Sequence, residues 1–134
     1  MDREADRTDI VIAIASTESV VEARQRGRDL ASQMGFTQSE ATMIAAAISE
    51  LARNIVQYAV RGEIRLRRDA SGMLFVIAKD EGPGIADVRS ALKPGYSTSG
   101  SLGLGLAGVQ RIADHFEIQS NPSGTTVTLG KKRL

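Results

Sequence analysis

The 134-residue sequence contains no cysteine, no tryptophan and a single histidine, His115. The lack of cysteine excludes disulfide scaffolds, thiolate metal sites and cysteine nucleophiles together. One histidine also argues against a metal centre built from several imidazoles. Three Phe and two Tyr are too few for the aromatic platforms on which single-stranded nucleic acids usually stack.

The sequence also lacks an excess of either charge and any long apolar run. Seventeen basic and sixteen acidic side chains leave a formal net charge of +1, so no overall field attracts nucleic acid or a membrane. No stretch approaches the roughly eighteen apolar residues of a membrane-spanning helix. The N-terminal residues are charged and mixed in sign, unlike a secretory signal. We therefore expect a cytoplasmic, soluble protein with neither a nucleic-acid nor a membrane partner.

The length predicts one domain, residues 1–134, made of alternating strand and helix patterns. Residues 9–15 alternate as a strand does, and a helix follows from a Ser16 or Thr17 cap to a stop at Gly35. Thr37 and Glu40 form a capping box that starts a longer helix, running to about residue 59. Further strands are predicted at 63–68, 73–79, 116–120 and 125–130, with a helix over 106–116. The strand 73–79 is nearly all apolar and is expected to lie centrally.

Residues 80–108 hold seven of the thirteen glycines and show almost no periodicity, which is typical of a loop that is either functional or disordered. Within it, residues 103–108 spell G-x-G-x-x-G. A dinucleotide fold would need a strand directly before this motif and an acidic residue about 20 positions after it, and both are lacking. The chain is also too short for a eukaryotic-type protein kinase and lacks its H-R-D and D-F-G motifs. A flexible linker remains an alternative for these glycines alone.

Two polar patterns sit beside this loop. Glu50 and Asn54 are four residues apart and emerge on one flank of the long helix, roughly 80 to 120° from its apolar stripe. On spacing alone the pair also fits a solvated helix edge. Asp80 ends the central strand, before a tight turn at residues 82–84, where its carboxylate can accept a hydrogen bond from an exocyclic amine. An ordinary turn is the alternative for this motif.

Taken in order, "ISELARNIVQYA", "DEGPGI", "GYSTSGSLGLGLAGVQRIADHF" and "GTTVTL" resemble the GHKL nucleotide-binding superfamily, and within it the RsbT switch kinases of bacterial stressosomes. The resemblance covers about residues 9–132. It implies an α+β fold: a two-layer sandwich with a mixed, mostly antiparallel sheet and helices on one face.

The resemblance also implies roles for single residues. Glu50 corresponds to the general base, and Asn54 to the residue that holds Mg²⁺. Asp80 corresponds to the acceptor for the adenine amine of ATP, with Gly82, Gly84 and Ile85 shaping the base pocket. The lid over the triphosphate corresponds to Tyr96, Ser97, Thr98, Gly100, Gly103 and Gly105, and either Thr125 or Thr126 is expected to add a hydroxyl beside the adenine.

Three features bear on the chemistry of this branch. Gln57 stands where many relatives have Lys or His, and residues 96–110 contain no Lys or Arg. Transfer is therefore expected to rely on Mg²⁺ and backbone donors, with slow turnover. Arg53 lies roughly 180° from the apolar stripe and is expected at the surface, where it could touch a partner.

The implied function is a serine/threonine-protein kinase that phosphorylates a STAS-domain antagonist or scaffold. Once released, it would activate a downstream regulator such as a PP2C-type phosphatase. One alternative is an anti-sigma factor kinase that sequesters a sigma factor. Another is a nucleotide-dependent binding module with little catalysis.

Overall fold

Alternating apolar residues build a five-stranded sheet in the computed structural model, which describes residues 9–59, 61–82 and 105–133. The strands are β1 (Asp9–Ile14), β2 (Gly62–Arg68), β3 (Met73–Asp80), β4 (His115–Asn121) and β5 (Gly124–Lys132). Their order is β1-β2-β3-β5-β4, and all four pairings of the described strands are antiparallel. The predicted α+β class and the central place of β3 are confirmed, and no parallel pair occurs among the strands described.

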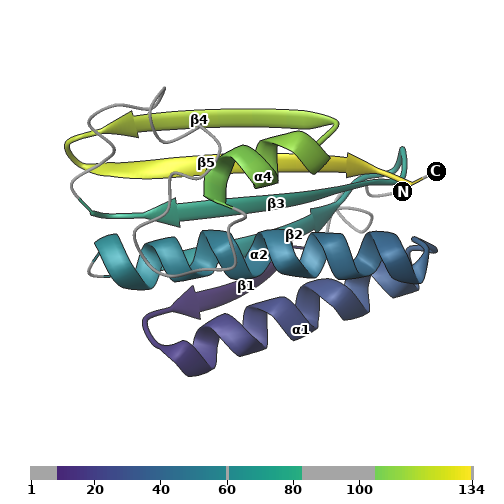
Figure 1. Ribbon diagram of the computed structural model, residues 1–134, viewed down its shortest axis with the longest axis horizontal. Coiled ribbons are helices and arrows are strands. Elements are labelled where there is room, and N and C mark those ends of the chain that lie inside the picture. The colour runs from purple at the N-terminus through teal and green to yellow at the C-terminus, as the bar shows by residue number, and fades with distance from the viewer. Residues whose placement is uncertain (1–8, 60, 83–104, 134) are drawn as a thin grey trace, which may run out of the picture.

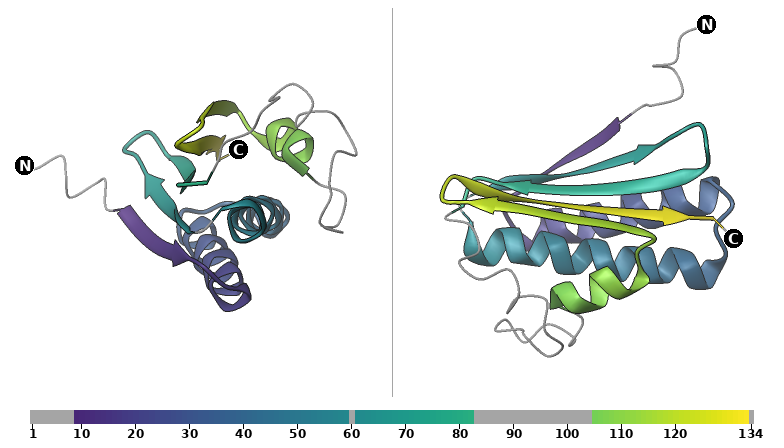
Figure 2. Two further views of the ribbon diagram at one scale, coloured as in Figure 1. Left: turned by 90° about the vertical axis from the view of Figure 1, so that its left-hand side faces the viewer. Right: turned by 90° about the horizontal axis from the view of Figure 1, so that it is seen from above.

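Three helices, α1 (Thr17–Gln33), α2 (Gln38–Tyr58) and α4 (Gly105–Ile112), cover one face of this sheet and form the second layer (Figures 1 and 2). The predicted capping box starts α2: Thr37 Oγ1 accepts from Glu40 N at 3.1 Å, and Glu40 Oε1 accepts from Thr37 N at 2.8 Å. Ser16 caps α1, which ends just before Gly35. Across the residues described, no helix has both the length and the apolar character needed to cross a membrane.

The apolar stripe of α2 forms the centre of the core. Ile44, Ile48, Leu51 and Ile55 are each 2% exposed or less. They belong to one cluster with the inward-facing residues of the sheet, among them Ile64 and Val76. Burying each such side chain contributes about 1.5–3 kcal/mol, so this stripe determines how α2 is rotated on the sheet. That rotation decides which α2 residues face away from the sheet.

The predicted helix over 106–116 is too long at its C-terminal end. α4 ends at Ile112, and His115 already begins β4. Phe116 instead lies opposite Leu129 of β5 and packs against the core. Pairing with β5 outweighs the helical spacing that the local sequence shows, because the sheet offers both backbone hydrogen bonds and apolar contact.

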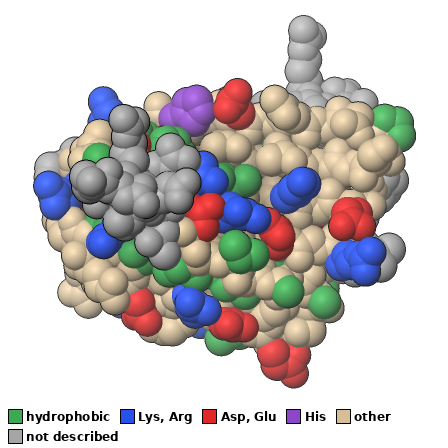
Figure 3. All heavy atoms as spheres, turned by 180° about the vertical axis from the view of Figure 1, so that it is seen from behind, with side chains coloured by type: hydrophobic (Ala, Val, Ile, Leu, Met, Phe, Trp, Pro, Cys, Tyr) green, Lys and Arg blue, Asp and Glu red, His purple; other side chains and the backbone are tan. Residues whose placement is uncertain are grey.

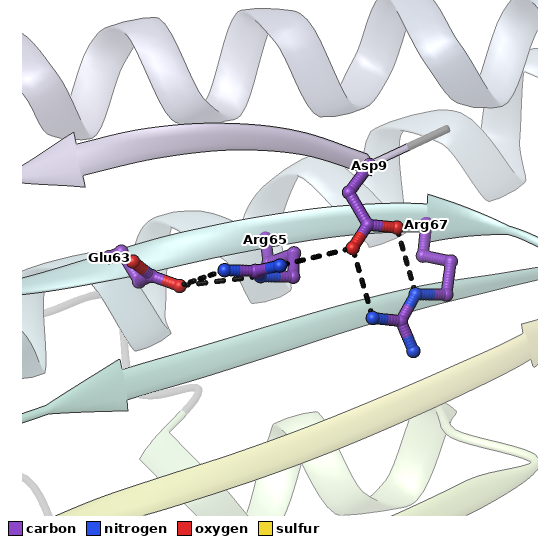
Figure 4. Close-up of polar contacts among 4 residues, drawn as sticks. All are labelled: Asp9, Glu63, Arg65 and Arg67. Atoms are coloured by element: carbon purple, nitrogen blue, oxygen red, sulfur yellow. Dashed lines mark hydrogen bonds and ion pairs between the residues drawn. The ribbon is translucent and has the colours of Figure 1, made fainter. Parts of the chain in front are cut away.

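Acidic and basic side chains lie next to one another on the opposite face of the sheet (Figure 3), and four of them form a network of ion pairs between β1 and β2 (Figure 4). Asp9 accepts from Arg67 Nε at 2.8 Å and Nη2 at 3.0 Å, and from Arg65 Nη1 at 3.2 Å. Arg65 also donates to Glu63 through Nη2 at 3.0 Å. The hydrogen bond from Arg67, followed by that from Arg65, holds the pKa of Asp9 at about 2. These side-chain contacts stabilise the pairing of the edge strand β1 with β2.

We expect Asp9→Asn to lower the free energy of unfolding at pH 7 by about 1–2 kcal/mol, after allowance for solvent screening of the partly exposed arginines. The folded-state pKa lies below the ordinary value of 3.8. The stabilisation is therefore fully present above about pH 4 and is lost as the pH falls towards 2. Urea unfolding of both proteins at pH 7 and at pH 3 measures this.

Glu22→Gln is the matched control, because it removes an exposed i,i+4 pair with Arg26 at 3.7 Å. Its effect should stay below about 0.5 kcal/mol. An Asp9→Asn effect no larger than that of Glu22→Gln would show that the network does not hold β1.

Candidate functional site

Four parts of the fold meet at one end of the sheet. The carboxyl end of β3, the start of β5 and the C-terminal half of α2 lie at the same end of the molecule, and the N-terminus of α4 points towards it (Figure 1). Asp80, the last residue of β3, pairs in register with Gly62 on one side and Thr125 on the other. The sheet therefore positions a carboxylate at its rim.

Asp80 is anchored through one of its two oxygens. Oδ1 accepts from the backbone N–H of Gly82 at 2.9 Å and of Thr125 at 3.2 Å. No group in the described part of the chain donates to Oδ2. The side chain is half-buried. Among the described residues, a carboxylate fixed in this way has an acceptor oxygen in a defined direction and with no donor, as recognition of an amine requires.

Strand alternation separates the two candidate threonines. Thr125 is 7% exposed and faces the helices, and its Oγ1 lies 2.9 Å from Ser120 Oγ. Thr126 lies opposite Lys79 in the ladder, on the other face of the sheet. The structure thus brings Thr125 to Asp80 and leaves Thr126 away from it.

Gly82 is buried against the carboxyl end of α2. A Cβ at this position would lie 2.8 Å from Ala59 Cβ and 2.9 Å from the Tyr58 carbonyl oxygen. Only glycine allows this approach without displacing the helix end. The turn after Asp80 is therefore packed directly against α2.

Glu50 lies on α2, and only 3% of its surface is exposed. Its Oε1 is buried without a hydrogen-bond partner in the described part of the structure. The Arg53 Nη1 atom is 3.8 Å away, close enough for an ion pair and too far for a good hydrogen bond. A buried carboxylate oxygen without a hydrogen bond is costly for folding, so Glu50 does not serve stability through this oxygen.

Asn54 follows Glu50 by one helical turn on the same flank of α2 and is half-buried. Its side-chain amide makes no hydrogen bond to any described residue. The described residues also contain no group of three or more His, Asp or Glu side chains able to hold a metal by themselves. A single free amide oxygen suits Mg²⁺, which commonly takes one or two protein ligands together with substrate phosphates.

Gly105 is the first residue of α4, buried, with φ at +56°, a conformation that favours glycine. The other residues expected to form the pocket and lid, namely Gly84, Ile85, Tyr96, Ser97, Thr98, Gly100 and Gly103, lie outside the described residues. Their expected roles stay predictions.

Sequence reasoning missed two features of the site. It placed Arg53 at the surface, where its side chain is indeed 39% exposed, but it missed that the guanidinium reaches back to Glu50. The i,i+3 spacing of opposite charges was the available signal. It also missed Ser120, which contacts Thr125 across the β4–β5 hairpin. No local pattern shows that contact, because it depends on hairpin register.

This arrangement, with polar side chains on one flank of a buried helix and a carboxylate at the end of the central strand, is that of a nucleotide-binding domain. Residues 13–131 match the family model of the histidine kinase-like ATPase domain, so the chain belongs to that family and uses ATP. Among solved structures, one with the RsbU and RsbW domains of a Mycobacterium tuberculosis protein aligns over 94% of this chain and 32% of that chain, with a TM-score of 0.69 at 19% identity. The SiaB–SiaC complex from Pseudomonas aeruginosa aligns over 96% of this chain and 91% of that one, with a TM-score of 0.62 at 16% identity. Both support the fold.

Curated relatives define the branch more closely. The serine/threonine-protein kinase RsbT of Bacillus subtilis is 45% identical over 112 residues, which cover 81% of this chain and 84% of RsbT. An anti-sigma F factor of Halalkalibacterium halodurans is 32% identical over 109 residues, 74% of each chain. The chain is therefore a serine/threonine-protein kinase of the RsbT family.

The two threonines provide a test of the site geometry. We expect Thr125→Val to lower the free energy of unfolding by about 1 kcal/mol, because it removes a buried hydroxyl contact with Ser120. The matched change Thr126→Val should have an effect within about 0.5 kcal/mol, since that residue is on the other face. Chemical denaturation of both variants measures the difference, and equal effects would contradict the assignment of faces.

Proposed function

We propose that this kinase transfers the γ-phosphoryl group of ATP to a serine or threonine of a STAS-domain antagonist in a bacterial stress partner-switching pathway. The observation that carries the proposal is Glu50, a buried carboxylate whose Oε1 has no hydrogen-bond partner in the part of the chain that the structure describes. It lies one turn before Asn54 on the same flank of α2, in the C-terminal half of the helix, which lies at the same end of the molecule as the carboxyl end of β3 (Figure 1). Such an oxygen is available to take a proton.

The base-binding part of the site is Asp80 with its neighbours. Its Oδ1 is held by two backbone donors, and its Oδ2 would accept from the adenine amine. Thr125, whose hydroxyl already contacts Ser120, would take part in the same network. Gly82 brings the backbone close to the base, and Gly84 and Ile85 are proposed to complete the pocket.

The phosphate-binding part combines Asn54 with backbone donors. Mg²⁺ held by the Asn54 amide oxygen would offset the charge of the phosphates. Backbone N–H groups at the start of α4, where Gly105 lies, suit an anion because they have no partner within the helix. Ser97, Thr98, Gly100 and Gly103 are proposed to close over the triphosphate.

Glu50 would act as the general base. It accepts the proton of the substrate hydroxyl as that oxygen bonds to the γ-phosphorus, and the bond to the bridging oxygen breaks to release ADP. Such a base typically accelerates a reaction about 10²- to 10⁴-fold. The products are ADP, the phosphorylated partner and the proton held on Glu50.

The partners are proposed from the family resemblance. A phosphate added at the docking surface would repel the kinase and release it. The free kinase would then activate a downstream regulator such as a PP2C-type phosphatase, in the cytoplasm. Identity of 45% to RsbT, against 32% to an anti-sigma F factor, supports this reading over sequestration of a sigma factor. Co-purification with a sigma factor would favour the alternative.

Because Glu50 is assigned to the chemical step and Asp80 to nucleotide binding, replacing Glu50 should change the rate of phosphoryl transfer without changing the affinity for ATP. We expect Glu50→Gln to reduce transfer from radiolabelled ATP to the STAS-domain protein by about 10²- to 10⁴-fold, with ATP affinity unchanged. Its free energy of unfolding should be unchanged or higher, because the variant no longer buries a charge with an unsatisfied oxygen. Single-turnover transfer, nucleotide titration and urea unfolding measure the three quantities.

Asp80→Asn is the complementary variant. It replaces one acceptor oxygen with a donor and should weaken ATP binding by at least about 10-fold. Transfer by Glu50→Gln at the wild-type rate would show that Glu50 is not the base. Nucleotide-dependent partner binding without any transfer by the wild type would favour the binding-module alternative.

A further inference from the structure

Arg53 has an unusual place relative to Glu50. Its Nη1 lies 3.8 Å from Glu50 Oε1; the Glu50 side chain is 4% exposed, whereas that of Arg53 is 39% exposed. An ordinary pair on a helix surface has two exposed members, as Glu22 and Arg26 do in α1. In α2 the cation reaches from solvent towards a carboxylate inside the protein.

The distance between these groups matters as much as their charges. An arginine hydrogen-bonded directly to Oε1 would occupy a lone pair of that oxygen and compete there with the incoming proton. At 3.8 Å the guanidinium offsets part of the buried charge while Oε1 stays without a hydrogen bond. The pair therefore compensates the carboxylate and leaves its acceptor free.

Helix geometry places Arg53 and Asn54 on opposite sides of Glu50. At 100° per residue, Arg53 is displaced from Glu50 by about 60° towards solvent, and Asn54 by about 40° towards the sheet. Arg53 is also the only cationic residue in α2, where Glu40 and Glu50 are the acidic ones. No other cation of this helix can replace it beside the carboxylate.

We infer that Arg53 is a positioning residue for Glu50, holding the carboxylate by an ion pair in the orientation from which it removes the proton of the substrate hydroxyl. The inference rests on the proposed role of Glu50 as the base. Loss of the charge should lower the rate of the chemical step and leave nucleotide binding intact, because Asp80 and its backbone donors belong to other elements.

The experiment compares Arg53→Met, Arg53→Lys and the matched control Arg26→Met, using radiolabelled ATP and a purified candidate STAS-domain protein. We expect Arg53→Met to lower kcat about 10-fold or more, with KM for ATP and for the STAS-domain protein each within about twofold of wild type. Arg53→Lys should recover most of the rate, because it restores a positive charge on a long stem. Arg26→Met should match wild type, and thermal unfolding should show all three variants folded.

A double-mutant cycle then separates this inference from the proposed function. Adding Arg53→Met to Glu50→Gln should cause no further loss, because Arg53 acts only through Glu50. A full additional loss, or a change confined to KM for the STAS-domain protein, would overturn the positioning role. If Glu50→Gln is slow while Arg53→Met has the wild-type rate, the inference alone fails; if Glu50→Gln transfers normally, the proposed base itself is wrong.

Discussion

The rest of the structure depends on the burial of one apolar stripe of α2 against the inner face of the sheet. Ile44, Ile48, Leu51 and Ile55 leave the helix almost no freedom to rotate, because each is nearly completely buried. With the rotation determined, Glu50 and Asn54 must project from the flank rather than into the core or into open solvent. The positions of the two side chains proposed to act in chemistry and metal binding are thus a consequence of hydrophobic packing.

The two carboxylates of the site are treated in opposite ways. Asp80 receives two backbone N–H groups on one oxygen, so it is rigid and satisfied on that side. Glu50 Oε1 is buried without a hydrogen-bond partner among the described residues, and the Arg53 guanidinium lies 3.8 Å from it. Recognition of the adenine ring benefits from a rigid hydrogen-bond acceptor, whereas removal of a proton needs an oxygen with no competing donor. The buried Glu50 oxygen without a hydrogen bond lowers the stability of the folded state locally. The hydrogen bonds of Asp80 and the ion pairs of Asp9 link neighbouring strands of the sheet and stabilise it.

Prediction from sequence succeeded where local signals and tertiary packing agree. The Thr37–Glu40 capping box started α2 at the expected residue, and the apolar run 73–79 became the central strand. It failed at the end of α4, where helical spacing continued to Phe116 but the chain pairs with β5 from His115 onward. It left Thr125 and Thr126 undecided, since neighbouring threonines in a strand differ only in the face that register assigns to them.

The sequence by itself determined the elements, their order and the residue types able to bind a nucleotide, because caps, periodicity and turns are properties of neighbouring residues. Only the tertiary structure decided which threonine joins Asp80, that Gly82 packs against the end of α2, and that Arg53 reaches Glu50. These outcomes depend on strand register, on close contact between segments far apart in the chain and on the degree of burial. None of the three can be read from local sequence, because each arises when the two layers pack together.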